Sequence, residues 1–177
     1  AASSVEKEGS ISNSGRLGQW RYKAINPIGH SEDDLWIMNQ IVNRIKTLYA
    51  KEGGAFPDPI INLNWNYGKV GLDGKIHNPS PREVAKEING YFIVDKEIED
   101  KAKGEIKKFK AGDMVPGFPM LQDDGSTVSG CWIYCGSVSD TENKMMKRDA
   151  TDPTGLGMYP NWAWCWPVNR RIIYNRA

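Results

Sequence analysis

The sequence predicts an α+β fold in which helices pack with a small antiparallel sheet. Apolar residues recur at helical spacing within residues 31–90, whereas strand-like segments separated by tight turns follow in residues 91–136. Because the two kinds of segment do not alternate along the chain, the pattern favours α+β over a doubly wound parallel sheet. A length of 177 residues suits one domain, which we expect to span residues 1–177.

The first 52 residues divide into a loop and a helix. Residues 1–30 are rich in Ser and Gly, so we expect a loop with a brief strand over residues 19–24. A helix is predicted to follow over residues 31–51, because Ser31 is a good N-cap and acidic residues occupy the first turn. The pair Gly53 and Gly54 would end it.

This helix has one apolar face, which we expect to be buried, while the opposite side is wetter. The apolar face comprises Met38, Ile41, Val42, Ile45 and Leu48, and the wetter side comprises Asn43, Arg44, Lys46 and Lys51. If the face is enclosed, Ile45→Ala would cost on the order of 2–5 kcal/mol.

The middle of the chain predicts a strand and a second helix. Residues 60–67 are bounded by Pro and Gly, which suggests a strand or extended segment. Ser80 and Glu83 form a capping box, with Pro81 at the first helical position. Asn89 and Gly90 would close this short helix.

A small sheet is predicted over residues 91–136. Its strands are expected at residues 91–98, 106–109 and 127–136, joined by Gly-containing turns. The lysines around Phe109 are typical of a soluble edge strand that is protected from pairing; they are Lys101, Lys103, Lys107, Lys108 and Lys110. Residues 137–161 are expected to form a long ordered loop.

The last segment, residues 162–177, combines tryptophans with arginines. Trp162, Trp164 and Trp166 alternate with other residues, so an extended chain would project all three indoles to one side. Arg170 and Arg171 follow, and arginine suits bidentate contacts to phosphate or carboxylate. The indoles either pack in a core or form a stacking platform for a sugar or nucleotide.

Charge and hydropathy exclude two classes of protein. The chain has 23 basic and 22 acidic residues and a net charge of +1, which argues against nucleic-acid binding through a broad basic face. No apolar run approaches the roughly 18 residues of a membrane helix, so we expect no direct membrane insertion.

The residues that commonly bind metals do not form a recognisable site. His30 and His77 are isolated, and the acidic residues Glu142, Asp149 and Asp152 lack the spacing of a calcium loop. We therefore predict no metal ligand in this chain.

The cysteines are Cys131, Cys135 and Cys165, which are too few to hold an iron–sulfur cluster. In a strand, Cys131 and Cys135 would lie about 13 Å apart, beyond disulfide reach. Either one could pair with Cys165, or all three are free thiols.

Five motifs together resemble one protein family. They are E-G-S-x-x-N-S-x-R with Q-W-R-Y-K-A, N-x-x-W-N-Y-G from Asn62 to Gly68, G-C-W-I-Y-C-G-S, R-D-A-T-D-P-T-G-L-G, and W-P-V-N-R-R-I-I-Y-N-R-A. In this order they resemble the catalytic (alpha) subunit of respiratory formate dehydrogenases, in the dimethyl sulfoxide reductase superfamily. The resemblance covers residues 6–177.

The resemblance implies an oxidoreductase of anaerobic respiration in the periplasm. Such enzymes oxidise formate to carbon dioxide at a molybdenum or tungsten centre held by two molybdopterin guanine dinucleotides. Electrons leave through a [4Fe-4S] cluster of the same subunit to an iron–sulfur beta subunit. The family's subunit is several times longer than this chain, which implies that this domain is excised from a larger multidomain enzyme. By the same resemblance, the catalytic residues and the cluster ligands lie elsewhere in that subunit, and this segment alone is inactive.

Two groups of residues are the candidate cofactor-binding sites. By resemblance, residues 1–30 form a cofactor-side loop in which Asn13, Ser14 and Arg16 approach a guanine dinucleotide, while Glu8 braces the loop. Some relatives carry an acidic residue at the position of Gly15, and any contact it makes there is absent here. A second cluster comprises Asn169, Arg170 and Arg171. Neighbouring residues in an extended chain point to opposite faces, so one arginine would reach a phosphate, a pterin oxygen or the formate path.

Overall fold

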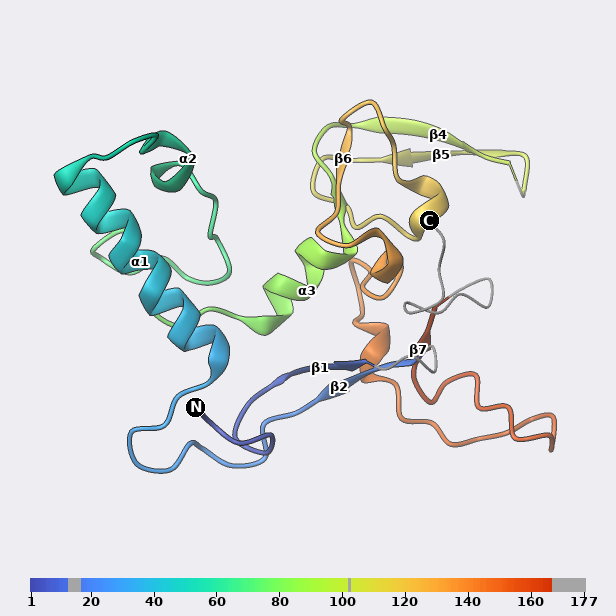
Figure 1. Cartoon of the computed structure of the whole chain (residues 1–177). Coiled ribbons are helices and arrows are strands. Elements are labelled where there is room, and N and C mark those ends of the chain that lie inside the picture. Colours follow the sequence, from blue (N-terminus) through green and yellow to red (C-terminus); the bar gives the residue numbers. More distant parts are fainter. Residues whose placement is uncertain (13–16, 102, 167–177) are drawn as a thin grey trace. The chain divides into compact units, whose positions relative to one another are not determined.

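The structure is a computed structural model that describes residues 1–12, 17–101 and 103–166. It divides into two compact units, and each is described by itself. We call residues 1–8 and 22–84 the helical unit, and residues 9–21 and 85–177 the sheet unit. The described residues form helices and small antiparallel sheets, so the predicted α+β class is confirmed (Figure 1). The extent of the single domain, residues 1–177, stays a prediction.

The long helix of the helical unit, α1 (Asp34–Glu52), begins and ends at local capping contacts. Asp33, not Ser31, is the N-cap: its carboxylate accepts from the Trp36 backbone N–H at 2.7 Å. The Ser31 hydroxyl instead donates to the Ile28 carbonyl at 2.8 Å. Gly53 ends the helix as predicted. Its φ of 70° lies in the left-handed region, which favours glycine, and its N–H donates to the Tyr49 carbonyl.

The buried side of α1 is the opposite of the one predicted. Its apolar side chains at positions 38, 41, 45 and 48 are exposed, and Ile45 is 38% exposed. Asn39 is fully buried: its amide donates to the Ile76 carbonyl at 2.6 Å and accepts from the Trp65 indole N–H at 3.0 Å. Asn43 donates to the same Ile76 carbonyl at 3.1 Å. Residues 65–77 therefore pack on the amide-bearing side of α1, because its side chains satisfy main-chain carbonyls there.

The segment predicted as a strand or extended chain over residues 60–67 begins inside a short helix, and its residues 62–67 are irregular chain and form no strand. Helix α2 (Asp58–Ile61) follows Pro57, and Pro59 occupies its first turn, where a fixed φ and a missing N–H are tolerated. Irregular chain follows α2 up to α3 (Pro81–Asn89). Helix α3 begins at Pro81 and ends before Gly90, as predicted, and the boundary between the two units falls inside it.

Two neighbouring strands near the start of the chain and one strand near its end form one sheet in the sheet unit. Strands β1 (Gly9–Ser12), β2 (Leu17–Arg21) and β7 (Trp164–Cys165) lie in the order β1-β2-β7, and both pairings are antiparallel (Figure 1). Trp20 on β2 is 1% exposed and lies in a core cluster with Trp164 and Trp166. The described part of residues 1–30 thus contains more strand than predicted.

Two antiparallel pairs make up the rest of the described strands, and only the pair β4–β5 is a hairpin. The segment predicted as one strand over residues 91–98 divides into β3 (Tyr91–Phe92) and β4 (Lys96–Asp100). Strand β3 pairs with β6 (Thr127–Val128), and β4 pairs with β5 (Glu105–Phe109). Phe92 stacks on Phe109 at 4.3 Å between ring centroids and belongs to a core cluster with Val115 and Cys135.

The predicted strand at residues 127–136 ends at Val128. Residues 132–134 form a 3₁₀ helix instead. The reason lies at Asn89, whose buried carboxamide oxygen accepts from the N–H groups of Gly136 (2.7 Å) and Val138 (3.0 Å). Because a side chain satisfies these donors, the backbone here has no need of a strand partner.

Two lysines of strand β5 make ion pairs within the β4–β5 hairpin. Lys107 pairs with Asp100, and Lys108 pairs with Glu97, each at 2.7 Å. The loop at residues 137–161 is irregular apart from a 3₁₀ helix at residues 144–146. Within the described ranges, no helix has the length and apolar character needed to cross a membrane.

Candidate functional site

All six predicted cofactor-binding residues lie outside the described residues. They are Asn13, Ser14, Arg16, Asn169, Arg170 and Arg171. The structure describes only the residues that lead toward these candidates. They are Ser12 and Leu17 on either side of the first group, and Cys165 and Trp166 before the second.

The pairing of β2 with β7 brings these residues to one end of the sheet. Strand β1 ends at Ser12 and β2 begins at Leu17, so residues 13–16 connect the two strands at that end. In the antiparallel register Leu17 faces Cys165 and Gly18 faces Trp164. Strand β7 therefore ends beside Leu17, where β2 begins (Figure 1). We call Ser12, Leu17, Cys165 and Trp166 the sheet end.

Aromatic rings pack behind the sheet end. The Tyr134 ring lies 6.1 Å from Trp164 and 5.2 Å from Trp166, and the two indoles are 5.5 Å apart. The Tyr134 hydroxyl lies 3.1 Å from the Ser12 hydroxyl, which joins β1 to the same cluster. Trp166 is 2% exposed, so this end of the sheet rests on packed rings.

The prediction that all three indoles share one side is wrong for Trp162. Only Trp164 and Cys165 form the strand, and Trp162 is 41% exposed while the other two indoles are buried. Its carbonyl accepts a hydrogen bond from the Gln19 carboxamide at 3.3 Å. Two of the three indoles are therefore covered by protein, and the stacking platform for a sugar or nucleotide has no support.

Arg148 ties the loop at residues 137–161 to the sheet, a role that the sequence pattern did not signal. Its guanidinium donates to the Met145 carbonyl at 3.1 Å and to the Trp20 carbonyl on β2. Met145 is buried in the core cluster that contains Trp20. The loop thus carries part of the core, and local sequence gives no sign of a contact between residues so distant.

The three cysteines are free thiols in three different environments. Cys131 is half-buried, Cys135 is buried, and Cys165 is exposed at the sheet end. Burial raises the pKa of the Cys135 thiol to about 12. Of the two alternatives that the sequence left open, three free thiols is the one observed.

The remaining polar candidates have partners within the protein. Asp73 pairs with His77 at 3.0 Å, and this hydrogen bond lowers the pKa of Asp73. Glu8 accepts from the Arg82 guanidinium at 2.8 and 2.9 Å, and its role in bracing the opening loop stays a prediction. In the part of the chain that the structure describes, no three His, Cys, Asp or Glu side chains gather closely enough to hold a metal ion.

Known proteins match this chain along nearly its whole length, although no family model matches it. It is 45% identical over 173 residues to the formate dehydrogenase-O major subunit of Escherichia coli, covering 98% of this chain and 16% of that protein. It is 43% identical over 181 residues to the formate dehydrogenase 2 subunit alpha (cytochrome c-553) of Nitratidesulfovibrio vulgaris. That match covers 100% of this chain and 16% of that protein. Against the formate dehydrogenase subunit alpha of Megalodesulfovibrio gigas it is 42% identical over 179 residues, with 99% and 17% covered.

The chain thus spans about one sixth of the length of the relatives it matches. The resemblance predicted from the motifs is confirmed over this length.

Proposed function

We propose that this chain, which corresponds to one segment of formate dehydrogenase major or alpha subunits, is part of the catalytic subunit of such an enzyme. The observation that carries this proposal is the identity of 40–45% over 98–100% of the chain. Fold alone would be a weak guide to activity, but a match of this extent to oxidoreductase subunits is specific. The reaction is the two-electron oxidation of formate to carbon dioxide.

The role proposed for this segment is to help enclose the pterin cofactor. The support is topological: the residues that lead into both candidate segments meet at the sheet end. A sheet end resting on Tyr134, Trp164 and Trp166 is a rigid base, and side chains on a rigid base keep a fixed geometry toward a ligand.

The donor types in the two candidate segments fit a nucleotide better than a metal. Arginine, asparagine and serine side chains donate hydrogen bonds to phosphate oxygens and guanine edges. In the described ranges, no three His, Cys, Asp or Glu side chains gather closely enough to hold a metal ion. By the resemblance, the protein ligand of the metal lies outside this segment. When bound, the molybdenum or tungsten bis-pterin centre supplies the redox chemistry.

Partners and location follow from the same proposal. The segment would contact the rest of the catalytic subunit, and electrons would pass through a [4Fe-4S] cluster to an iron–sulfur beta subunit. A relative whose name includes cytochrome c-553 supports an electron-transfer assembly. The proposed location is the periplasm.

The test is an assay of the intact subunit that carries this segment. Purified anaerobically, it should contain molybdenum or tungsten with two pterin guanine dinucleotides and should reduce an artificial electron acceptor with formate. An intact subunit that holds metal and pterin but does not oxidise formate would refute the substrate. A subunit without pterin would refute the cofactor.

A further inference from the structure

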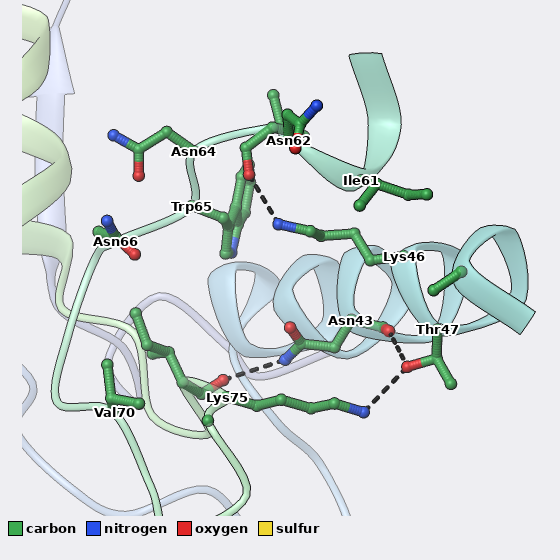
Figure 2. Close-up of a pocket in the computed structure, with 14 residues that line it drawn as sticks. Asn43, Lys46, Thr47, Ile61, Asn62, Asn64, Trp65, Asn66, Val70 and Lys75 are labelled. Atoms are coloured by element: carbon green, nitrogen blue, oxygen red, sulfur yellow. Dashed lines mark hydrogen bonds between the residues drawn. The ribbon is translucent and has the colours of Figure 1, made fainter. Parts of the chain in front are cut away.

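The helical unit contains a pocket with a mixed polar and apolar lining that the proposed function does not use. It has a volume of about 590 Å³ and is lined by α1, by the end of α2 and by residues 62–76 (Figure 2). This volume is in the range of small-molecule sites. Its lining includes Lys46 and Lys75 but no Asp or Glu. The carboxylate of Asp73 lies beside this lining, where it accepts from the Lys75 backbone N–H at 3.2 Å and pairs with His77. The charged groups of the lining itself are therefore the two ammonium groups.

Both ammonium groups are held by neutral oxygens. Lys46 donates to the Leu63 carbonyl at 2.7 Å, and Lys75 donates to the Thr47 hydroxyl at 2.9 Å (Figure 2). The Thr47 hydroxyl in turn donates to the Asn43 carbonyl at 2.8 Å. Within residues 1–12, 17–101 and 103–166 neither lysine forms an ion pair. An ammonium has three donors, so each lysine keeps two for a ligand.

Amide side chains add further hydrogen-bonding capacity along the pocket. Asn62, Asn64 and Asn66 line it, and their side chains make no hydrogen bond to another residue of the described part. Trp65, between two of them, is fixed because its indole N–H donates to buried Asn39. The pocket thus combines fixed walls with unused polar groups, which suits a polar ligand that carries negative charge.

We propose that this pocket binds a small polar molecule through a phosphate or carboxylate group, with Lys46 and Lys75 as the charged contacts. An oxyanion would receive charge-assisted hydrogen bonds from both ammonium groups. The free amides would contact the rest of the molecule. The proposal is independent of formate oxidation, since every residue in it belongs to the helical unit.

The test is a nuclear magnetic resonance titration of the 177-residue chain with inorganic phosphate, with acetate in a parallel arm. The Trp65 indole N–H and the side-chain amides of Asn62 and Asn66 are the reporters, and sodium chloride at equal ionic strength sets the baseline. We expect saturable shifts of these reporters. Saturation by phosphate alone, by acetate alone or by both would support the site and identify the anionic group. Shifts equal to those in sodium chloride would overturn it.

Charge variants separate the pocket from a general effect of positive charge. Lys46→Gln and Lys75→Gln should each weaken the binding about tenfold, the usual consequence of losing one charge-assisted contact. Lys51→Gln is the matched control, because Lys51 lies on the same helix and pairs with Glu52 at 3.9 Å. The proposal would be overturned if Lys51→Gln weakened anion binding as much as the pocket variants, or if Lys75→Gln did not weaken it. Lys75→Gln keeps the test valid even if Lys46→Gln fails to fold.

Discussion

A single buried amide organises the sheet unit at the residue scale. Asn89 has no exposed surface, and all of its hydrogen-bonding groups are used. Its nitrogen donates to the Gly90 and Val115 carbonyls, at 2.9 and 3.1 Å, and its oxygen accepts from Gly136 and Val138. One side chain thus joins α3 to two later segments.

Replacement of Asn89 by leucine should therefore destabilise the chain strongly. The apolar side chain is similar in size but leaves buried N–H and C=O groups without partners, at a cost of at least about 3 kcal/mol of unfolding free energy. Urea unfolding followed by circular dichroism measures this. Asn64→Leu, at an exposed position, is the control and should change stability by less than about 0.5 kcal/mol. Equal midpoints for the two variants would show that Asn89 is not the organising contact.

The cysteines should differ in reactivity. The thiolate is the reactive form, and a pKa of about 12 keeps Cys135 protonated at neutral and mildly alkaline pH. Cys165 is exposed. In the folded chain at pH 8, iodoacetamide should modify Cys165 well before Cys135, as peptide mass spectrometry would reveal. Modification of Cys135 at the same rate as Cys165 would contradict the burial described here.

At the element scale, helix α1 separates what periodicity can predict from what it cannot. The apolar repeat located the helix to within three residues at its start and one at its end. It could not identify the neighbour that packs on the helix, because periodicity records only that one side is apolar. In the helical unit the neighbour packs on Asn39 and Asn43 instead.

The corrected orientation of α1 changes the expected mutational costs. Since Ile45 is 38% exposed, Ile45→Ala should cost less than about 1 kcal/mol in this chain, below the range for an enclosed site. Asn39→Ala should cost about 1–3 kcal/mol, because it leaves the Ile76 carbonyl and the Trp65 indole unsatisfied. Denaturant unfolding curves of the two variants show which one loses more unfolding free energy. A larger loss for Ile45→Ala would mean that the apolar face is the buried one.

Two aspartates near the β4–β5 hairpin should make the stability of the fold depend on pH in the acidic range. Hydrogen bonds from Lys96 and then Ser126 lower the pKa of Asp124, and a hydrogen bond from Lys110 lowers the pKa of Asp95, both below the ordinary 3.8. A carboxylate with a depressed folded-state pKa stabilises the fold above its unfolded-state pKa. That contribution is lost as the pH falls through the folded-state value.

The expected result is a melting temperature that falls as the pH drops below about 4. At pH 7, the Asp124→Asn variant should have a lower melting temperature than the original chain. On acidification, its melting temperature should fall by less than that of the original chain. Melting curves at pH 7, 4 and 2.5 test this. If the melting temperatures of the two proteins fall by the same amount, Asp124 does not cause the acid dependence of stability.

The strands show a second limit of sequence reasoning. Residues 127–136 have the composition of a strand, yet the structure has a 3₁₀ helix at 132–134, because Asn89 takes the N–H groups of Gly136 and Val138. The sheet β1-β2-β7 was missed for a related reason: Leu17 and Cys165 pair across most of the chain, and no local pattern specifies that pairing. The candidate residues were named by resemblance, whereas the pairing of the described residues that lead toward them emerges only from the register.

At the scale of the whole molecule, each unit is fixed by a fully buried asparagine, Asn39 in the helical unit and Asn89 in the sheet unit. Satisfied buried amides favour one defined arrangement of the loops around them. Ordered loops would suit the cofactor-enclosing role proposed above for this segment, which is similar to formate dehydrogenase subunits.

The central claim is that this segment lies against a pterin cofactor, and the pterin content of an Arg16 variant tests it most directly. The intact subunit would be purified as the original sequence, as Arg16→Ala, and as Arg44→Ala. Arg44 is exposed on α1 and provides a control of equal charge change. Guanosine monophosphate released by acid hydrolysis, measured per subunit, should fall clearly in Arg16→Ala and stay at the original level in Arg44→Ala. Equal guanosine monophosphate content in all three proteins, with unchanged formate oxidation, would contradict the account.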